Sequence, residues 1–296
     1  MSTLTSTKWT PREVGELLVE SLPYIQRFAN RVIVVKYGGN ALAGADEANA
    51  VQSFARDVAL LRAVGMRPVV VHGGGPQISA MMERLGKKPE FVGGLRVTDA
   101  ETIEIASMVL LGNVNPQIVN AINSFGANAV GISGQDAALL RVRQRDPQLG
   151  FVGDIESVDA SVVQSLLDDG AIPVIATIGS DGQGQAYNVN ADTAAAAIAG
   201  AISAQKVIYL TDVPGILRDR HDTGSLVARA TRTEIAEMIA TGVIDGGMIP
   251  KVESCLYALD AGVPDAHILD GRVEHVLLIE LFTEAGVGTM IVGGEK

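Results

Sequence analysis

The sequence predicts an α/β protein, a three-layer αβα sandwich with a central, mostly parallel sheet and one extra helix at the N-terminus. Short runs rich in valine and isoleucine alternate along the chain with longer segments of helical period. These runs are apolar throughout, which is typical of parallel strands buried on both faces. With 296 residues, of which 47% are hydrophobic, the chain is long enough to bury such a core.

The chain begins with a helix that stands outside this alternation. Thr10-Pro11-Arg12-Glu13 forms a capping box with proline at the first helical position, and apolar residues then recur at helical spacing to about Ala29. This helix either packs on its own domain or extends as an arm onto another subunit. Its residues alone favour the first interpretation.

The remaining elements follow in order along the chain. Strands are predicted at 31–37, 68–72, 172–178, 206–210, 266–269 and 289–292. Helices are predicted at 48–64, from 76 onward, and at 99–111, 115–125, 159–169, 191–202, 232–241, 248–261 and 274–282. A hairpin is predicted at 91–98, and short strands at 127–158. The glycine-rich run at 180–184 indicates a domain boundary or a long turn.

Composition excludes several classes of protein. The 34 acidic and 23 basic residues give a formal net charge of −11, which argues against a broad surface for nucleic acid or an anionic membrane. A single cysteine, Cys255, cannot form an intrachain disulfide, which favours a reducing compartment. The N-terminus lacks the pattern of a signal peptide, and no run approaches the ~18 apolar residues of a membrane span. We therefore expect a cytoplasmic protein.

Three glycine-rich or polar junctions follow predicted strands: YGGN at 37–40, HGGG at 72–75 and TDVPG at 211–215. Ligands bind beyond the carboxyl ends of strands in open α/β sheets, where glycine lets the backbone approach and helix N-termini offer N–H groups to anions. Each junction alone is as consistent with a tight structural turn.

Several known active-site motifs are missing from the sequence. It has no GxxxxGK[ST], no GxGxxG after the first strand, no GxSxG and no protein-kinase motif set. Four scattered histidines and one cysteine give poor support for a zinc site.

Four charged residues lie at positions that suggest a structural or functional role for the charge. Lys36 ends a buried strand, so it must be paired, face a ligand or reach back to water. Asp192 and Lys251 lie at predicted helix starts, where a carboxylate is favourable and a cation is unfavourable unless an anion is present. Arg96, in the predicted hairpin, is placed to clamp a carboxylate with two parallel hydrogen bonds.

Taken in order, eight segments resemble those of the acetylglutamate kinases, a branch of the amino-acid kinase family: KYGGN, VVVHGGGPQI, GLRVTD, VGISGQDA, YNVNADTAA, YLTDVPG, GGMIPK and AHILDGRVEH. The resemblance covers residues 18–292. It implies the amino-acid kinase fold and the ATP-dependent phosphorylation of the γ-carboxylate of N-acetyl-L-glutamate, the second step of arginine biosynthesis. It also implies an oligomerisation helix at 1–30, an N-acetylglutamate-binding lobe at 31–180 and an ATP-binding lobe at 181–296.

The resemblance further implies roles for single residues. Lys36 and Lys251 match the lysines that stabilise the transferred phosphoryl group, and Asp192 matches the aspartate that holds both. The residues that match the substrate site are Gly74, Gly75, Arg96 and Asn188. The residues that match the nucleotide site are Gly38, Gly39, Thr211, Asp212 and Gly215.

The implied chemistry agrees with these residue types. The nucleophile is a carboxylate with a reference pKa of about 4.3, so it is ionised at neutral pH and needs no general base. Catalysis then consists of aligning two anions and neutralising charge on the phosphoryl oxygens. The motifs hold no clustered carboxylates, so we expect no protein metal site and a Mg²⁺ ion held mainly by the phosphates of ATP and by water.

The two ends of the chain resemble the arginine-inhibited branch of the family. That branch forms a hexamer, a trimer of dimers tied together by swapped N-terminal helices, so a dimer or hexamer is implied. The residues that match its L-arginine effector region are Tyr24, His267, Glu280 and Gly286. We expect arginine to inhibit, and deletion of residues 1–29 to remove both hexamer and inhibition. Some relatives in photosynthetic organisms bind a PII-type signalling protein, which the sequence leaves open. Gln135 stands where many relatives have lysine and is assigned no role.

Two alternatives remain at this stage. The first is another member of the same family, such as a carbamate, glutamate 5-, aspartate or uridylate kinase. The second is a catalytically inactive arginine-sensing or carrier-binding protein on this fold. The joint presence of Lys36, Asp192 and Lys251 argues against the second.

Overall fold

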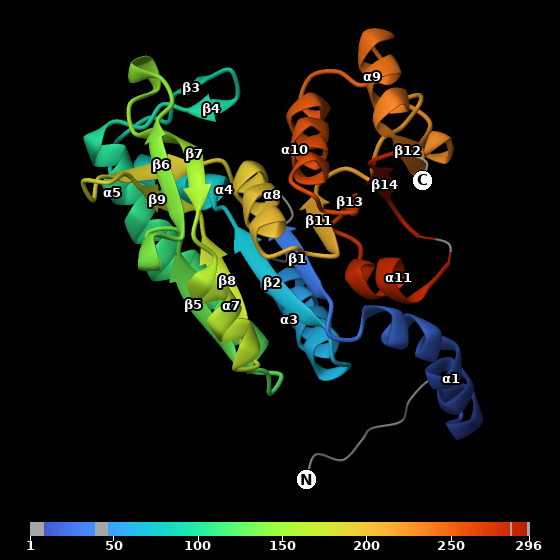
Figure 1. The fold of residues 1–296 in the computed structure, drawn as a ribbon. Coiled ribbons are helices and arrows are strands. Elements are labelled where there is room, and N and C mark those ends of the chain that lie inside the picture. The colour runs from blue at the N-terminus through green and yellow to red at the C-terminus, as the bar shows by residue number, and fades with distance from the viewer. Residues whose placement is uncertain (1–8, 39–46, 285, 295–296) are drawn as a thin grey trace.

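The computed structural model describes residues 9–38, 47–284 and 286–294, so the predicted site residue Gly39 lies outside the described residues. Within them, eight strands form one central sheet, in the order β12-β14-β13-β11-β1-β2-β8-β5 (Figure 1). Adjacent strands are parallel, except that β14 runs antiparallel to β13. The predicted mostly parallel sheet is confirmed.

The strands of the central sheet closely follow the predicted apolar runs. They are β1 (Val32–Tyr37), β2 (Arg67–His72), β5 (Ala129–Ser133), β8 (Ile172–Ala176), β11 (Lys206–Thr211), β12 (Arg229–Thr231), β13 (Asp265–Asp270) and β14 (Thr289–Val292). The short strand β12 at the sheet edge is the one of these that the sequence patterns do not predict.

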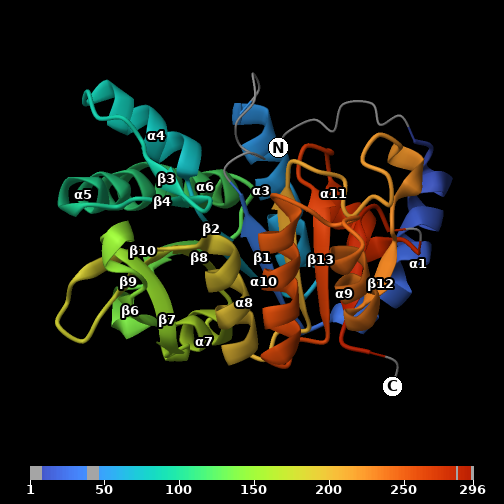
Figure 2. The same ribbon diagram turned by 90° about the horizontal axis from the view of Figure 1, so that it is seen from above.

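Helices cover both faces of the sheet, as a three-layer sandwich requires (Figure 2). Apolar residues on one face form a core with α3 (Glu47–Ala63), α4 (Gly75–Arg84), α5 (Ala100–Val109), α6 (Asn115–Asn123) and α11 (Val276–Phe282). Those on the other face form a second core with α7 (Ser161–Asp168), α8 (Ala191–Ala201), α9 (Arg232–Ala240) and α10 (Met248–Asp260).

The alternation of side chains along β1 decides where Lys36 points. Ile33 and Val35 belong to the core beneath α3, whereas Val32 and Val34 belong to the core beneath α8. Because successive side chains in a strand point to opposite faces, Lys36 lies on the same face as Val32 and Val34. The strand therefore delivers its lysine to the side of the sheet that carries α8.

A small closed barrel packs beside the sheet and contains the glycine-rich run at 180–184. It consists of β6 (Leu140–Gln144), β7 (Val152–Val158), β9 (Ile178–Ser180) and β10 (Ala186–Val189). Strands β9 and β10 pair as an antiparallel hairpin, so the run at 180–184 is a turn, in which Asp181 accepts from two backbone N–H groups. The division of the chain at residue 180 into two lobes stays a prediction.

The predicted hairpin is confirmed as β3 (Phe91–Val92) and β4 (Leu95–Arg96). Gly93 and Gly94 form its turn with φ of +57° and +78°, a region that favours glycine. The structure also contains three short 3₁₀ turns, at Asp136–Ala138, Pro147–Leu149 and Thr223–Ser225.

Helices α5 and α6, predicted as separate helices, are continuous through one π-helical turn, Leu110–Val114. Pro116 lacks a backbone N–H and so cannot complete a regular ladder at this point. By length and composition alone, the combined run Ala100–Asn123 could cross a membrane, but half of its apolar window is buried inside the protein, as in a core helix.

The N-terminal helix α1 (Pro11–Phe28) begins with the predicted capping box, since Thr10 and Glu13 each accept from the other's backbone N–H. Its C-terminal end is anchored by the buried side chain of Phe28, and it packs against α11. The rest projects from the body of the protein (Figure 1). It leaves a row of apolar side chains exposed: Val14, Leu17, Leu18, Val19 and Leu22.

Candidate active site

Most of the predicted site residues line one pocket, which opens to solvent and has an empty volume of about 1080 Å³. It lies at the carboxyl ends of β1, β2 and β11, where the fold class places ligands. The predicted residues that it brings together are Lys36, Gly38, Gly74, Gly75, Arg96, Asn188, Asp192, Thr211, Asp212 and Lys251.

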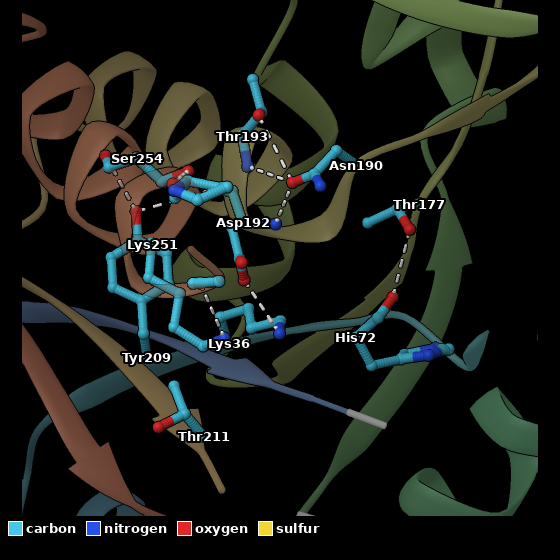
Figure 3. Close-up of polar contacts among 12 residues, drawn as sticks. Lys36, His72, Thr177, Asn190, Asp192, Thr193, Tyr209, Thr211, Lys251 and Ser254 are labelled. Carbon is cyan, nitrogen blue, oxygen red and sulfur yellow. Dashed lines mark hydrogen bonds and ion pairs between the residues drawn. The ribbon is translucent and has the colours of Figure 1, made fainter. Parts of the chain in front are cut away.

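Lys36 and Asp192 form an ion pair at the base of this pocket. The Nζ of Lys36 lies 2.8 Å from Oδ1 of Asp192, with 13% and 18% of the two side chains exposed (Figure 3). Asp192 lies in the first turn of α8, where the helix dipole favours a carboxylate. Asn190 caps this helix by accepting from the backbone N–H groups of Asp192 and Thr193. The pair therefore holds the ammonium group of Lys36 in a defined place.

Lys251 reaches the same pocket from α10. Its Nζ donates to the carbonyl of Gly247, one helical turn earlier, at 3.5 Å. Within the described residues it makes no ion pair, so Asp192 pairs here with Lys36 alone, whereas the resemblance implies contact with both lysines. Lys251 thus presents its charge to the pocket without a carboxylate partner.

Two glycines are required by the close approach of other groups. A Cβ on Gly38 would lie 2.6 Å from Nζ of Lys36 and 3.0 Å from the carbonyl oxygen of Leu210. A Cβ on Gly74 would lie 2.6 Å from a methyl group of Leu110. Larger residues at these positions would displace the lysine or the glycine loop. A Cβ on Gly75, in contrast, would meet open space.

Arg96, at the end of β4, is the most deeply buried cation of the pocket, with 7% of its surface exposed. One guanidinium nitrogen donates to the Gly75 carbonyl and to Oγ of Ser79, each at 2.8 Å. A second approaches the sulfur of Met82 at 3.3 Å, and the group stacks over the Phe91 ring at 4.8 Å. These contacts fix the plane of the guanidinium.

This arginine has no carboxylate partner among the described residues. Burial lowers the pKa of Arg96, which reflects the cost of keeping its charge away from water. A buried cation without a counter-ion is unfavourable unless an anion completes the site. The arrangement therefore fits a carboxylate or phosphate ligand at this end of the pocket.

The histidine that precedes the glycine loop is not placed for acid–base chemistry. His72 is fully buried and does not line the pocket, and burial lowers its pKa to about 4. No histidine lines the pocket in the part of the chain that the structure describes. This arrangement suits a nucleophile that needs no proton removed.

The other predicted residues divide into two groups. Asn188 on β10 lines the pocket, and Asp212 lines both it and a second, adjoining pocket. Thr211 is buried, with Oγ1 bonded within its own loop to the carbonyl of Val213. Gly215 lines neither pocket: it has φ of +140°, and a Cβ there would collide with Thr289.

The adjoining pocket is a feature that the sequence patterns missed. It shares Asp212 and Lys251 with the first and is lined further by residues of the loop after β11 and of the start of α10, among them Arg218, His221 and Met248. The polar loop at 216–225 has no periodic signal, so nothing in the sequence marked it. The two pockets together form one extended site with Lys251 at their junction.

A second cluster, on the far side of β11, joins three of the predicted effector residues. His267 is buried on β13, and its Nδ1 lies 2.8 Å from Oε1 of Glu280 on α11. The backbone N–H of Val287 donates to the other oxygen of Glu280. Gly286, with φ of +54°, brings the chain close enough that a Cβ would lie 3.2 Å from Glu280.

Lys206, which sequence reasoning missed, completes this cluster. Its Nζ donates to Nε2 of His267 at 2.8 Å, forms an ion pair with Asp265 at 3.2 Å, and lies over the Phe28 ring. Burial lowers the pKa of both Lys206 and His267. A lysine opening a strand was its only sequence signal. Tyr24, half-buried on α1 one turn before Phe28, has no bond to the cluster among the described contacts.

The described residues contain no group of three or more His, Cys, Asp or Glu side chains able to hold a metal ion. A divalent cation at this site would therefore need ligands from the substrate or from water.

The match to known proteins agrees with the fold and the pocket. The family model described as "Amino acid kinase family" matches residues 31–270, so the chain belongs to the amino acid kinase family. Curated relatives named acetylglutamate kinase match almost the whole chain. That of Synechococcus sp. is 52% identical over 95% of this chain and 94% of its own length. Those of Gloeobacter violaceus and Desulfitobacterium hafniense are each 50% identical, over 97% and 95% of this chain and 95% and 99% of their own lengths. Within the family, the chain belongs to the acetylglutamate kinases.

Solved structures show the same fold in larger and more distant proteins. N-acetylglutamate synthase from Neisseria gonorrhoeae, complexed with coenzyme A and N-acetylglutamate, has a TM-score of 0.83 and 26% identity. The match covers 95% of this chain and 64% of the synthase, so this chain spans less than two thirds of that protein's length. The structure of the same synthase complexed with coenzyme A and L-arginine has a TM-score of 0.78 and 25% identity. That match covers 95% of this chain and 65% of the synthase. Giardia carbamate kinase, at 17% identity and a TM-score of 0.69, with 90% and 100% coverage, shows the fold alone.

Proposed function

We propose that this protein transfers the γ-phosphoryl group of ATP to the γ-carboxylate of N-acetyl-L-glutamate, giving N-acetyl-L-glutamyl 5-phosphate and ADP in arginine biosynthesis. The observation that carries the proposal is the distribution of cations in one pocket. Arg96 is buried without a carboxylate partner among the described residues, Lys36 and Lys251 line the same pocket, and Lys251 also lines the adjoining pocket. Relatives of about 50% identity that are named acetylglutamate kinase support it.

A substrate with two carboxylates suits this arrangement. The planar guanidinium of Arg96 binds the carboxylate that does not react, since its orientation is fixed by Gly75 and Ser79. The reacting carboxylate then points toward Lys36, and Asn188 offers an amide for hydrogen bonds to the acetamido group. Binding one carboxylate and leaving the other free aligns the nucleophile.

The chemical step needs charge neutralisation and no proton transfer. A γ-carboxylate oxygen forms a bond to the γ-phosphorus while the bond from phosphorus to the bridging oxygen of ADP breaks. Lys36, Lys251 and the backbone N–H groups at 73–75 stabilise the charge on the phosphoryl oxygens. Asp192 keeps the ammonium of Lys36 in position by their ion pair.

The adjoining pocket accommodates the nucleotide in this proposal. It shares Asp212 and Lys251 with the substrate pocket, which supports binding of the phosphates at the junction and of the nucleoside near Arg218, His221 and Met248. Mg²⁺ supplies further neutralisation of the phosphates when it accompanies ATP. Since the described residues offer no cluster of metal ligands, the ion is held mainly by phosphates and water.

A substrate panel with hydroxylamine tests this proposal. Hydroxylamine converts acyl phosphates into stable hydroxamates, so product forms only when a carboxylate has been phosphorylated. We expect ATP-dependent hydroxamate from N-acetyl-L-glutamate and far less from glutamate or aspartate, whose free amino group differs from the acetamido group. Equal or better turnover of another acceptor, carbamate included, would assign the protein to another activity of the family. Binding of ligands without ATP consumption would indicate an inactive binding protein.

We further propose that the cluster of Lys206, His267 and Glu280 is the L-arginine effector site. The Glu280 carboxylate can accept from a guanidinium, and hydrogen bonds from His267 and Val287 keep its pKa below the usual value although burial raises it. The cluster touches the buried Phe28 at the end of α1, so it lies where the N-terminal helix joins the body. Inhibition by micromolar to millimolar arginine in the hydroxamate assay tests this role.

The uncovered face of α1 supports a homo-oligomer in which this helix docks on another copy. Its apolar residues are exposed in the single chain, which is costly in water unless a partner covers them. A hexamer formed as a trimer of dimers, a cytoplasmic location and a PII-type partner are further implications of the resemblance. Sedimentation of the purified protein measures the assembly directly.

A further inference from the structure

The π-helical turn Leu110–Val114 has a place in the site that its sequence does not reveal. In this turn the backbone N–H of Asn115 donates to the carbonyl of Leu110, five residues back. Single π turns inside α-helices are uncommon and recur at functional sites. Here Leu110, at the start of the turn, lies against the glycine loop at 73–75 that follows β2, and Asn115, just after the turn, bonds to His72, which in turn contacts the Gly73 carbonyl.

The side chains of Leu110 and Val114, the first and last residues of the turn, pack against the loop. Leu110 lines the substrate pocket, and a Cβ on Gly74 would lie 2.6 Å from its Cδ2 and 3.3 Å from Cγ2 of Val114. The glycine loop therefore rests directly on these two side chains. A regular helix would rotate one of the ends away, because a π turn adds one residue to the helical repeat.

The second end of the turn is tied to the loop by hydrogen bonds. Nδ2 of Asn115 donates to Nε2 of His72 at 3.0 Å, and Nδ1 of His72 lies 2.9 Å from the carbonyl of Gly73. Since an amide NH₂ can only donate, Nε2 must accept and Nδ1 must carry the proton that is donated to Gly73. The tautomer of His72 thus follows from Asn115.

Two further contacts fix the orientation of the Asn115 side chain. Its Nδ2 also donates to the carbonyl of Val174 at 2.9 Å, which fixes which end of the amide faces His72. Its Oδ1 lies against Gly131 so closely that a Cβ there would overlap it. Both Asn115 and His72 are buried, so neither bond competes with bulk water.

We propose that this π-helical turn sets the position of the glycine loop, and that Asn115 is a positioning residue for N-acetylglutamate, acting through His72. The inference rests on the proposed function, in which the loop's N–H groups face the reacting groups. Leu110 supports the loop at one side while Asn115 fixes its backbone carbonyl at the other. The turn therefore acts on substrate binding without Asn115 contacting the substrate.

Asn115→Ala and Asn115→Asp test this proposal with Asn123→Ala as the matched control. Asn123 lies on the same helix and also makes two side-chain bonds to a strand, with the backbone of Ala129. It does not line the substrate pocket. We expect both Asn115 variants to raise KM for N-acetylglutamate about tenfold or more while KM for ATP changes less than twofold. Asn123→Ala should lower the Tm without changing either KM.

The isosteric Asn115→Asp variant separates hydrogen bonding from packing. The ionised carboxylate that this substitution introduces only accepts, so it favours the proton on Nε2 of His72 and turns Nδ1 into an acceptor facing the Gly73 carbonyl. With four histidines in the chain, ¹⁵N NMR of the imidazoles can follow this change. We expect a protonated Nδ1 in the wild type and a reversed tautomer, or an imidazolium, in Asn115→Asp.

The NMR result does not depend on catalysis, so it distinguishes the two proposals. If the wild type makes no acyl phosphate but the tautomer changes as expected, the positioning network stands and the proposed function fails. If the wild type is active but Asn115→Ala lowers the Tm and leaves KM unchanged, as Asn123→Ala does, Asn115 is merely structural and this inference is wrong. A wild-type His72 protonated at Nε2 would overturn it as well.

Discussion

The three cations of the pocket differ in what balances their charge. Lys36 has Asp192 at 2.8 Å, whereas Lys251 has a helix carbonyl at 3.5 Å and Arg96 has neutral oxygens and a sulfur. The first charge is balanced within the protein, and the other two have no carboxylate partner among the described residues. In the proposed mechanism, Lys36 and Lys251 serve the chemical step, and Arg96 serves the binding of N-acetylglutamate.

Replacement of either lysine should affect the chemical step. We expect Lys36→Ala or Lys251→Ala to fold normally and to lower kcat about 100-fold or more, because each stabilises charge that develops on the phosphoryl oxygens. Steady-state kinetics of ADP release measures this. Lys88→Ala, outside the pocket, serves as the control and should retain wild-type kinetics. A wild-type kcat in Lys36→Ala would rule out its role.

Replacement of the buried arginine should affect one substrate only. Arg96→Ala removes the binding partner of the non-reacting carboxylate, so we expect KM for N-acetylglutamate to rise with KM for ATP nearly unchanged. Arg96→Lys should not restore KM, since an ammonium cannot make two parallel hydrogen bonds. Equal increases in the two KM values would place Arg96 elsewhere in the mechanism.

Burial of His72 predicts a pH dependence of stability. Its pKa of about 4 in the folded protein lies below the unfolded value of 6.5, so below pH 6.5 the unfolded state binds the proton more readily. The stability is therefore complete above pH 6.5 and falls as pH decreases, by about 2 kcal/mol between pH 7.5 and pH 5.

Urea unfolding of the wild type and His72→Gln at these two pH values isolates this contribution, because the carboxylates titrate in both proteins. The wild type should lose about 2 kcal/mol more than the variant. Identical pH dependence in the two proteins would contradict the assignment.

At the scale of elements, the position of α1 bears on the hypothesis that deletion of residues 1–29 removes both the hexamer and the inhibition by arginine. Deletion of residues 1–29 removes Phe28, which is 3% exposed and lies beneath Lys206, so that truncation would also disturb the cluster of Lys206, His267 and Glu280. The exposed apolar row lies further out, between Val14 and Leu22. Substitutions there separate assembly from local stability.

We predict that the double variant Leu18→Glu, Val19→Glu dissociates the proposed hexamer while the fold is retained, because charged groups at an apolar face that docks on another copy would be desolvated without partners. Analytical ultracentrifugation gives the mass, and the hydroxamate assay with arginine gives the inhibition. Arg12→Ala, on an exposed part of the same helix, is the control. An unchanged hexamer would remove α1 from the interface.

The elements also show what a sequence can predict. The strands of the central sheet, apart from β12, and the capping box are predicted because local patterns determine them. The π turn at 110–114 was not, because its extra residue is stabilised by contacts with Gly74 that are distant in sequence. The closed barrel was missed for the same reason, since its closure depends on long-range pairing of short strands.

The same distinction between local patterns and long-range contacts applies to the candidate site. The position of Lys36 before a glycine turn, and of Arg96 in a hairpin, marked them as unusual in the sequence, and the resemblance supplied their roles. Lys206 was missed because its contact with His267 depends on the pairing of β11 with β13. Of the adjoining pocket the sequence marked only Asp212 and Lys251, because an irregular loop forms much of the rest.

For the whole molecule, net charge and local charge give different information. The chain carries −11 overall, yet its pocket brings together three cations, backbone N–H groups of the glycine loop and two carboxylates, of which Asp192 is paired with Lys36. The overall charge describes a surface unsuited to polyanions. The pocket forms where the carboxyl ends of several strands meet. Its cations make it suited to binding two small anions next to each other.

The central claim is that a carboxylate oxygen of N-acetylglutamate attacks the γ-phosphorus of ATP in this pocket. The most direct measurement uses N-acetyl-L-glutamate labelled with ¹⁸O in its γ-carboxylate, with hydroxylamine present to release phosphate from the acyl phosphate by attack at carbon. ³¹P NMR then reads the isotope shift of that phosphate. We predict phosphate that carries one ¹⁸O atom. Unlabelled phosphate, formed while ATP is consumed, would contradict the account.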